Sequence, residues 1–145
     1  MDTLDTKGLK LEGDHFGLHI PFMDTLGLES VHADDQGAHT FLRWSEKNVN
    51  SRGDVHGGAL MSALDYTLSA AARAHIPDSG MATIEMSTQF LSPARGDIQV
   101  TANCLHIVDD IAYCKAVAID DKKRTVATAT ASFKVVRRRG ENSRV

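Results

Sequence analysis

The chain has 145 residues, of which 42% are hydrophobic and 24% are charged, the size and composition of one globular domain. Its formal net charge of −3 gives no positive field that would select a nucleic-acid partner. The N-terminal residues lack a basic segment followed by an apolar one, and no apolar run approaches the ~20 residues that span a bilayer. We therefore expect a cytoplasmic protein with no membrane partner.

Residues 1–19 are polar and mixed in character, and we expect them to form a loose N-terminal arm. A single domain is expected over residues 20–140, followed by a short C-terminal tail at residues 141–145. Within the domain, residues 20–31 predict one short helix that stops near Gly27.

The middle of the chain changes from a hairpin to a helix. The segment SVHADDQGAHTFLRWS has a turn at Gly37 between two extended stretches, which predicts a hairpin. Residues 46–55 are polar and contain glycine, so we expect a loop. From Gly57 to His75 the segment is rich in Ala, Leu and Met, and the next proline is Pro77. This segment predicts a helix of about five turns, apolar nearly all round and therefore buried.

Four extended runs follow the helix, at residues 81–92, 97–108, 111–120 and 124–137. The links between them are short and hairpin-like, so we expect each run to lie antiparallel to the next one in the chain. One face of the last run is made of alanines and a phenylalanine, which lets a helix approach closely. The predicted fold is α+β, a curved antiparallel sheet of about six strands wrapped around one long central helix.

Cys104 and Cys114 are the only cysteines, and both lie in strand-like stretches. Their positions would suit a cross-strand disulfide. Without a secretion signal, two reduced thiols are the favoured interpretation.

Asp65 lies in the middle of the apolar helix, where a carboxylate needs an explanation. An unpaired buried carboxylate costs several kcal/mol or becomes protonated. A structural interpretation is that Asp65 bonds Ser62, Tyr66 or Ser69, or faces solvent. A functional interpretation is that it acts as a base or nucleophile where water is scarce.

The helix begins with His56-Gly57-Gly58. The first N–H groups of a helix have no intrahelical partners, and the helix dipole makes this end positive. Two glycines leave room for a ligand, so the segment predicts a donor pocket for an oxyanion or a polarised carbonyl. The alternative is that the glycines only allow the chain to turn.

Gly58 and Asp65 share one stripe of the helix but lie about 10 Å apart along its axis. A carbonyl bound at the helix start is therefore beyond the reach of the Asp65 of the same protomer. If both groups act on one substrate, the acid must come from a second copy of the chain. We therefore expect at least a homodimer, with the site in its interface.

Spacing within a longer motif carries a family resemblance. Asn50 precedes His56 by six positions and Asp65 follows it by nine. With Thr83-Ile84-Glu85-Met86 and Phe90-Leu91-Ser92-Pro93-Ala94-Arg95-Gly96-Asp97, this pattern resembles the hotdog-fold acyl-CoA thioesterases of the phenylacetate-degradation (PaaI-like) type. The resemblance covers residues 25–138 and implies a curved antiparallel sheet around one helix.

The resemblance implies catalytic roles for five residues. Asp65 would be the general base or the nucleophile, and both remain open. The Gly57 N–H would polarise the thioester carbonyl, and Asn50 would orient the water or the carbonyl across the interface. His56 would shape the loop, and Thr83 would position the water or the carboxylate, although serine is common at its place.

It also implies that acyl-CoA is the partner and substrate, bound by a homodimer or a dimer of dimers with no cofactor and no metal. The implied substrate-binding and CoA-binding residues are Gly58, Phe90, Ser92, Arg95, Arg137 and Arg138. A solvated tail is an equal alternative for the arginines at 137–139. Two rival functions on this fold are a non-catalytic acyl-CoA-binding module and an enoyl-CoA hydratase.

Other motifs are set aside. Arg-Gly-Asp occurs at residues 52–54 and at residues 95–97, and both fall in expected turns. His32, Asp34 and His39 have metal-capable side chains, but their spacing matches no common metal motif. No G-x-S-x-G elbow is present, which argues against the common serine esterase plan.

Overall fold

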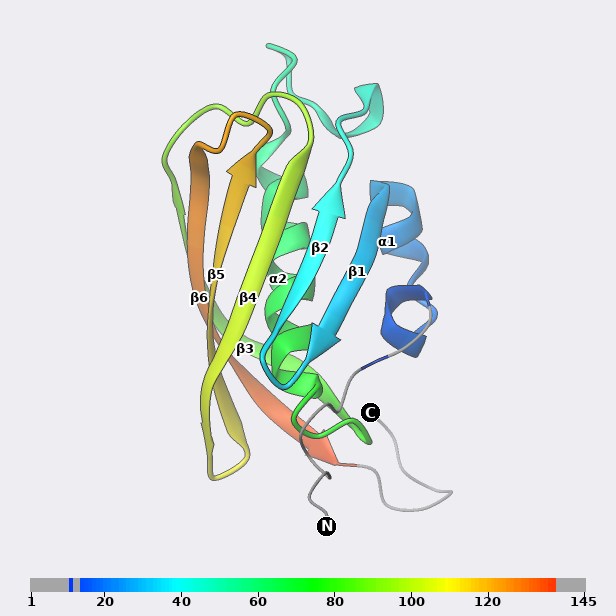
Figure 1. The fold of residues 1–145 in the computed structure, drawn as a ribbon, viewed down its shortest axis with the longest axis vertical. Coiled ribbons are helices and arrows are strands. Elements are labelled where there is room, and N and C mark those ends of the chain that lie inside the picture. Colours follow the sequence, from blue (N-terminus) through cyan, green and yellow to red (C-terminus); the bar gives the residue numbers. More distant parts are fainter. Residues whose placement is uncertain (1–10, 12–13, 138–145) are drawn as a thin grey trace.

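The computed structural model describes residue 11 and residues 14–137. One six-stranded antiparallel sheet has the strand order β1-β2-β4-β5-β6-β3, and one long helix, α2, lies against it (Figure 1). The elements are η1 (Asp14–Gly17), α1 (Pro21–Leu26), β1 (Leu28–Asp34), β2 (Gly37–Leu42), η2 (Glu46–Asn48), α2 (Gly57–Arg73), β3 (Ser79–Phe90), β4 (Ile98–Val108), β5 (Ile111–Asp120) and β6 (Thr125–Arg137).

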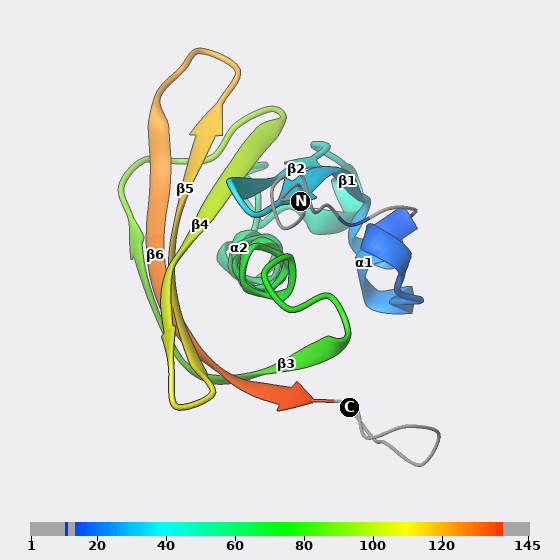
Figure 2. The same ribbon diagram turned by 60° about the horizontal axis from the view of Figure 1, so that its bottom comes forward.

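The sheet curves around α2, as the view along the helix shows (Figure 2). Small side chains allow this close wrapping, because β5 and β6 turn a row of buried alanines toward the helix. Leu60, Leu64 and Leu68 of α2 are at most 2% exposed and fill the space between the helix and the sheet. The predicted α+β fold, a curved antiparallel sheet around one central helix, is confirmed. The row of alanines is Ala112, Ala116, Ala118, Ala127, Ala129 and Ala131.

One predicted strand neighbour is wrong. β3 does not pair with β4, the next strand in the chain, but lies antiparallel to β6 from Ser79↔Arg137 to Phe90↔Ala127. The link after β3 is held on the loop in front of α2, where the Val55 N–H donates to the Ala94 carbonyl over 2.7 Å. It therefore crosses the end of the sheet instead of reversing in a hairpin (Figure 1), and β3 becomes an edge strand.

Other local predictions agree with the structure, except that Glu46–Asn48 in the expected loop form the 3-10 helix η2. The Gly37 hairpin pairs β1 with β2, and β4, β5 and β6 are consecutive antiparallel neighbours. Helix α1 ends where Gly27 adopts a left-handed conformation with φ of 80°, which glycine takes readily. Cys104 and Cys114 face each other on β4 and β5 as free thiols.

Residues 14–17 are packed on the domain, which corrects the expectation of a loose arm over the whole of residues 1–19. Phe16 is 4% exposed and its ring stacks on Tyr66 of α2, with centroids 5.9 Å apart. Arg73, at the far end of the same helix, donates from Nη2 to the Phe16 carbonyl over 2.7 Å. The apolar ring of Phe16 therefore belongs to the hydrophobic core.

Candidate active site

The Gly57 N–H is a free backbone donor at the start of α2. The Gly58 N–H donates to Nδ1 of the N-cap residue His56 over 2.8 Å, so the imidazole is used as a helix cap and carries its proton on Nε2 when neutral. A Cβ on Gly58 would stand 3.1 Å from this Nδ1, so glycine allows the cap to close. The Gly57 N–H has no hydrogen-bond partner among the described residues.

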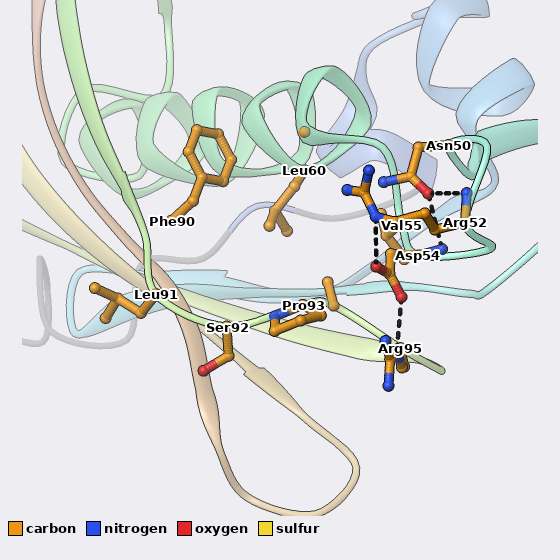
Figure 3. Close-up of a pocket in the computed structure, with 12 residues that line it drawn as sticks. Asn50, Arg52, Asp54, Val55, Leu60, Phe90, Leu91, Ser92, Pro93 and Arg95 are labelled. Atoms are coloured by element: carbon orange, nitrogen blue, oxygen red, sulfur yellow. Dashed lines mark hydrogen bonds and ion pairs between the residues drawn. The ribbon is translucent and has the colours of Figure 1, made fainter.

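A cavity of about 470 Å³ opens beside Gly57, and we call it the helix-start cavity. The loop in front of α2, the first turn of α2 and the end of β3 with the link that follows it form its walls (Figure 3). It brings together five of the residues expected at the site, Asn50, Gly57, Phe90, Ser92 and Arg95.

The Phe90 ring covers the helix start. A Cβ on Gly57 would lie 3.6 Å from its Cε1 atom, which is ordinary contact. Phe90 is nevertheless 53% exposed, so one side of the ring faces open space. The ring therefore lies beside Gly57, and a donor that is partly shielded from water interacts more strongly with a developing charge than one in bulk water.

Asn50 holds the loop that carries the site. Its Oδ1 accepts hydrogen bonds from the Arg52 N–H at 2.9 Å and the Asp54 N–H at 3.1 Å, and its own N–H donates to the Asp54 carbonyl. The carbonyl side of the Asn50 amide is thus occupied by its own loop. Only the amide Nδ2 is left for a substrate or a water molecule.

Two arginines flank a buried carboxylate at the edge of the helix-start cavity. The Asp54 side chain is 6% exposed, and Nε of Arg95 lies 2.7 Å from Oδ1 while Nε of Arg52 lies 3.7 Å from Oδ2. Figure 3 shows the two guanidinium groups on either side of Asp54. Both arginines are largely exposed, so their outer N–H groups remain available for an anion.

Arg52 and Asp54 were missed by the sequence analysis, which set both Arg-Gly-Asp segments aside as turns. The structure joins the Asp54 of the first segment to the Arg95 of the second. The indication in the sequence was the repeated Arg-Gly-Asp, because an arginine of one such loop can pair with an aspartate of the other. The pairing became visible only once the link after β3 was placed against the loop in front of α2.

Asp65 is half-buried, and Thr83 of β3 donates its hydroxyl proton to Oδ1 over 2.9 Å. None of the structural partners considered for Asp65 bonds it. The Ser62 and Ser69 hydroxyls donate to backbone carbonyls of α2, and the Tyr66 hydroxyl bonds Ser30. Burial raises the pKa of the Asp65 carboxyl above its ordinary value, and the Thr83 hydrogen bond opposes this shift.

Asp65 lies eight residues after Gly57, about 12 Å along the helix axis. It does not line the helix-start cavity. The structure of one protomer therefore divides the expected catalytic groups into a donor end, with Gly57 and Asn50, and an acid pair, with Asp65 and Thr83.

The remaining expected residues lie elsewhere. His56 and Gly58 line a separate cavity of about 250 Å³ beside α1. Arg137 pairs with Asp110 over 2.7 Å. Its end of β6 lies beside the start of β3, whereas Arg95 follows the end of β3. The length of β3 therefore separates the two arginines within one protomer, so they cannot bind one nucleotide together. Arg138 lies outside the described residues.

Two further properties concern the described part of the chain only. No three His, Cys, Asp or Glu side chains there gather into a group that would hold a metal ion. No helix among these residues has the length and apolar character needed to cross a membrane.

Comparison with known proteins places this fold and motif in context. The family model described as "Thioesterase superfamily" matches residues 52–127. The chain is 26% identical to the medium/long-chain acyl-CoA thioesterase YigI of Escherichia coli, over 89% of this chain and 94% of YigI.

Solved structures show the same fold. The conserved protein PA5202 of Pseudomonas aeruginosa superimposes with a TM-score of 0.76 at 25% identity, over 81% of this chain and 94% of that one. The PaaI protein of the Escherichia coli phenylacetic acid degradation operon has a TM-score of 0.74 at 18% identity, over 80% and 84% of the two chains.

Proposed function

Because the chain belongs to the thioesterase superfamily, we propose that it hydrolyses acyl-CoA thioesters to the free acid and CoA. The similarity to YigI, named as an acyl-CoA thioesterase, supports the substrate class. The observation that carries the proposal is the combination of a half-buried carboxyl with a raised pKa, Asp65, and a free helix-start N–H, Gly57. A base and an oxyanion donor are the two groups that thioester hydrolysis requires.

The proposed active unit is a homodimer joined through β3. β3 is an edge strand, and Ile84, Phe90 and Leu91 are exposed on it and just beyond it, each by more than half. A long edge strand with exposed apolar side chains is a template for pairing with another chain. Antiparallel pairing with the β3 of a second copy brings Gly57 of one protomer toward Asp65 of the other, and two such dimers would form the expected tetramer.

In this arrangement the thioester carbonyl accepts a hydrogen bond from the Gly57 N–H. Water adds to the carbonyl carbon as Asp65 of the partner protomer removes its proton, and the C–S bond breaks to release the CoA thiolate, which takes up a proton. Direct attack by Asp65, followed by hydrolysis of the anhydride, uses the same geometry. Thr83 holds the carboxylate in place, and the Asn50 Nδ2 is positioned to orient the water or the carbonyl.

The helix-start cavity suits the CoA arm in this proposal. Phe90 and Ser92 line its wall, and Arg95, together with Arg52, offers guanidinium groups for the phosphates. Arg137 and Arg138 would contribute from the partner protomer. No resident cofactor or metal is proposed, because a thioester has little amide-type resonance and a good leaving group, so a carboxylate and a fixed donor suffice.

The direct test is thiol release from a panel of acyl-CoAs by the purified full chain. We expect free CoA to appear in proportion to enzyme. Tight acyl-CoA binding without any thiol release would favour a non-catalytic binding module. A change in enoyl-CoA absorbance without thiol release would favour a hydratase, and either result would overturn the proposal.

The shared site is tested by mixing two inactive variants. Asp65→Asn removes the acid and Gly57→Pro removes the donor, so a mixed dimer has one site with both groups intact. Subunits mixed in equal amounts by co-refolding should regain about a quarter of wild-type activity, because half of the dimers are mixed and each has one intact site. No recovery, with mixed dimers shown to form, would place both groups in one protomer.

A further inference from the structure

A second cavity, of about 350 Å³, lies beside the second half of α2. Apolar side chains from three segments contribute to its lining, namely Leu18 and Ile20 before α1, Ala70 on α2, and Pro77 and Met81 around the start of β3. Its polar lining residues are Tyr66, Ser69, Arg73 and Ser79. We propose that this cavity, which we call the acyl cavity, binds the acyl group of a medium-length acyl-CoA and that residues 14–20 set its length limit. This inference rests on the proposed thioesterase function and adds the substrate range.

The acyl cavity lies about one helical turn beyond the Asp65–Thr83 pair, and neither residue of the pair lines it. Ser69, which lines it, follows Asp65 by four residues and so lies one turn further along the same helix stripe. Met81 precedes Thr83 by two residues on β3 and faces the same side of the sheet. A carbonyl carbon beside Asp65 would therefore have its acyl chain directed into this cavity.

The two cavities lie on opposite sides of the reacting atoms in the proposed dimer. The helix-start cavity adjoins Gly57, and the acyl cavity lies about one helical turn beyond Asp65. Antiparallel pairing of two chains places the Gly57 of one beside the Asp65 of the other. The CoA arm then lies in a cavity of one protomer and the acyl group in a cavity of its partner, with the scissile bond between them.

Residues 14–20 form a fixed wall of the acyl cavity. His15 and Phe16 have left-handed backbone conformations, with φ of 47° and 55°, which residues of this kind adopt only when their surroundings hold them there. Those surroundings are the stack of Phe16 on Tyr66, the Arg73 hydrogen bond to the Phe16 carbonyl, and a 2.6 Å contact between His15 Nε2 and Asp24 Oδ1. Leu18 lies two residues after Phe16, lines the cavity together with Ile20, and is 40% exposed.

The size of the acyl cavity selects the substrate class. Pockets for small molecules usually span about 300–1,000 Å³, so this cavity is near the lower limit. The apolar side chains of Leu18, Ile20 and Met81 offer contact surface to a hydrocarbon chain, whereas Ser69 and Arg73 make the α2 side of the cavity partly polar. We therefore expect octanoyl-CoA to be a better substrate than acetyl-CoA, which leaves the cavity empty, and than palmitoyl-CoA, which exceeds it.

The test compares two Leu→Trp variants. Leu18→Trp places a large ring at the mouth of the acyl cavity, and the exposure of Leu18 spares the fold. Leu105→Trp is the matched control, because Leu105 on β4 is 54% exposed and lines neither cavity. kcat/KM is measured for acetyl-, butyryl-, octanoyl- and palmitoyl-CoA.

We expect Leu18→Trp to lower kcat/KM for octanoyl-CoA on the order of tenfold relative to acetyl-CoA, the scale on which hydrophobic pockets discriminate chain length. Leu105→Trp should keep the wild-type profile. Met81→Ala, which enlarges the cavity, should shift the preference toward palmitoyl-CoA.

The outcomes separate the two proposals. If wild type releases thiol but both tryptophan variants have its chain-length profile, the acyl group binds elsewhere and only this inference fails. An equal loss by Leu18→Trp for every substrate, acetyl-CoA included, would also overturn it. If wild type releases no thiol from any acyl-CoA, the proposed function fails as well.

Discussion

The first turn of α2 and the turn around Asp65 belong to one helix but have opposite environments. At the first turn, Gly57 keeps its N–H free beside an open cavity, and a glycine pair leaves the backbone accessible. Around Asp65 the neighbouring helix residues Leu64 and Tyr66 are buried. The Asp65 carboxylate accepts one hydrogen bond, from Thr83. A donor must remain open to accept its substrate, whereas a base gains proton affinity from partial burial.

In the proposed mechanism, this difference is the reason that two chains are needed. A stiff helix fixes the distance between its first and third turns, so the open end and the shielded acid cannot meet on one substrate atom. Because α2 lies against the sheet along its length, it cannot bend to bring them together. Pairing two antiparallel copies of the helix solves the problem without changing either environment.

The largest expected effect is at the open end. Gly57→Pro removes the backbone N–H but suits the first position of a helix, and His56 already has the extended conformation that a following proline requires, with φ of −59° and ψ of 137°. We expect kcat to fall about 10²–10³-fold, as on removal of an oxyanion donor elsewhere. The measurement is thiol release under saturating acyl-CoA.

The control is Gly57→Ala, which keeps the N–H. Its Cβ would meet the Phe90 ring at an ordinary 3.6 Å, so activity should stay within a few-fold of wild type. Equal losses in the two variants would mean that the space at Gly57 matters and the N–H does not.

At the shielded acid, Asp65→Asn should lower turnover at least about 100-fold with little change in CoA affinity. It should also stabilise the protein at neutral pH. Folding raises the Asp65 pKa, so the folded state favours the protonated carboxyl, and this contribution to stability is lost as the pH rises through the folded pKa. Asparagine removes the cost of the buried charge, and we expect the Tm to rise by about 2–4 °C.

The same pKa shift predicts the pH profile. Because the base must be ionised, kcat/KM of the wild type should fall as the pH decreases through the raised pKa of Asp65. The midpoint of this acid limb should lie above the ordinary aspartate value of 3.8. An acid limb at or below that value, or an unchanged Tm for Asp65→Asn, would show that Asp65 is solvated.

A smaller effect is expected from Phe16→Ala, which tests how much the N-terminal segment stabilises the second half of α2. Removing a ring that is 4% exposed should lower the free energy of unfolding by about 3 kcal/mol. Phe22→Ala is the matched control, because Phe22 is 54% exposed and its loss should cost at most about 0.5 kcal/mol. Urea titrations of the two variants should differ accordingly, and similar midpoints would contradict the packing of residues 14–17.

The smallest effect is expected at the edge of the helix-start cavity. Arg95→Gln should raise KM for acyl-CoA several-fold and leave kcat nearly unchanged, because an exposed arginine contributes to binding more than to chemistry. The loss should shrink at high salt. Arg43→Gln, which removes an exposed arginine paired with Glu29 outside the cavity, should leave KM unchanged.

The sequence alone predicted the features that depend on neighbouring residues. The change to an apolar, proline-free segment gave helix 57–75, which the structure ends two residues earlier, at Arg73. Alternation gave the strands, and glycine gave the stop after α1 and the turn of the first hairpin. The residues around His56-Gly57-Gly58 and Asp65 carried the resemblance to the hotdog thioesterases, and the family match confirms it.

Tertiary structure decided the position of β3, the join between the two Arg-Gly-Asp segments, and the burial of Phe16. Each of these joins parts of the chain far apart in sequence. β3 could pair with either β4 or β6 on local grounds, and the anchoring of Ala94 and Arg95 on the loop in front of α2 selects β6. Phe16 lies in a short segment with no hydrophobic periodicity, so only the space beside Tyr66 shows that its ring is buried. Local patterns specify each element, whereas the free energy of packing them together selects their partners.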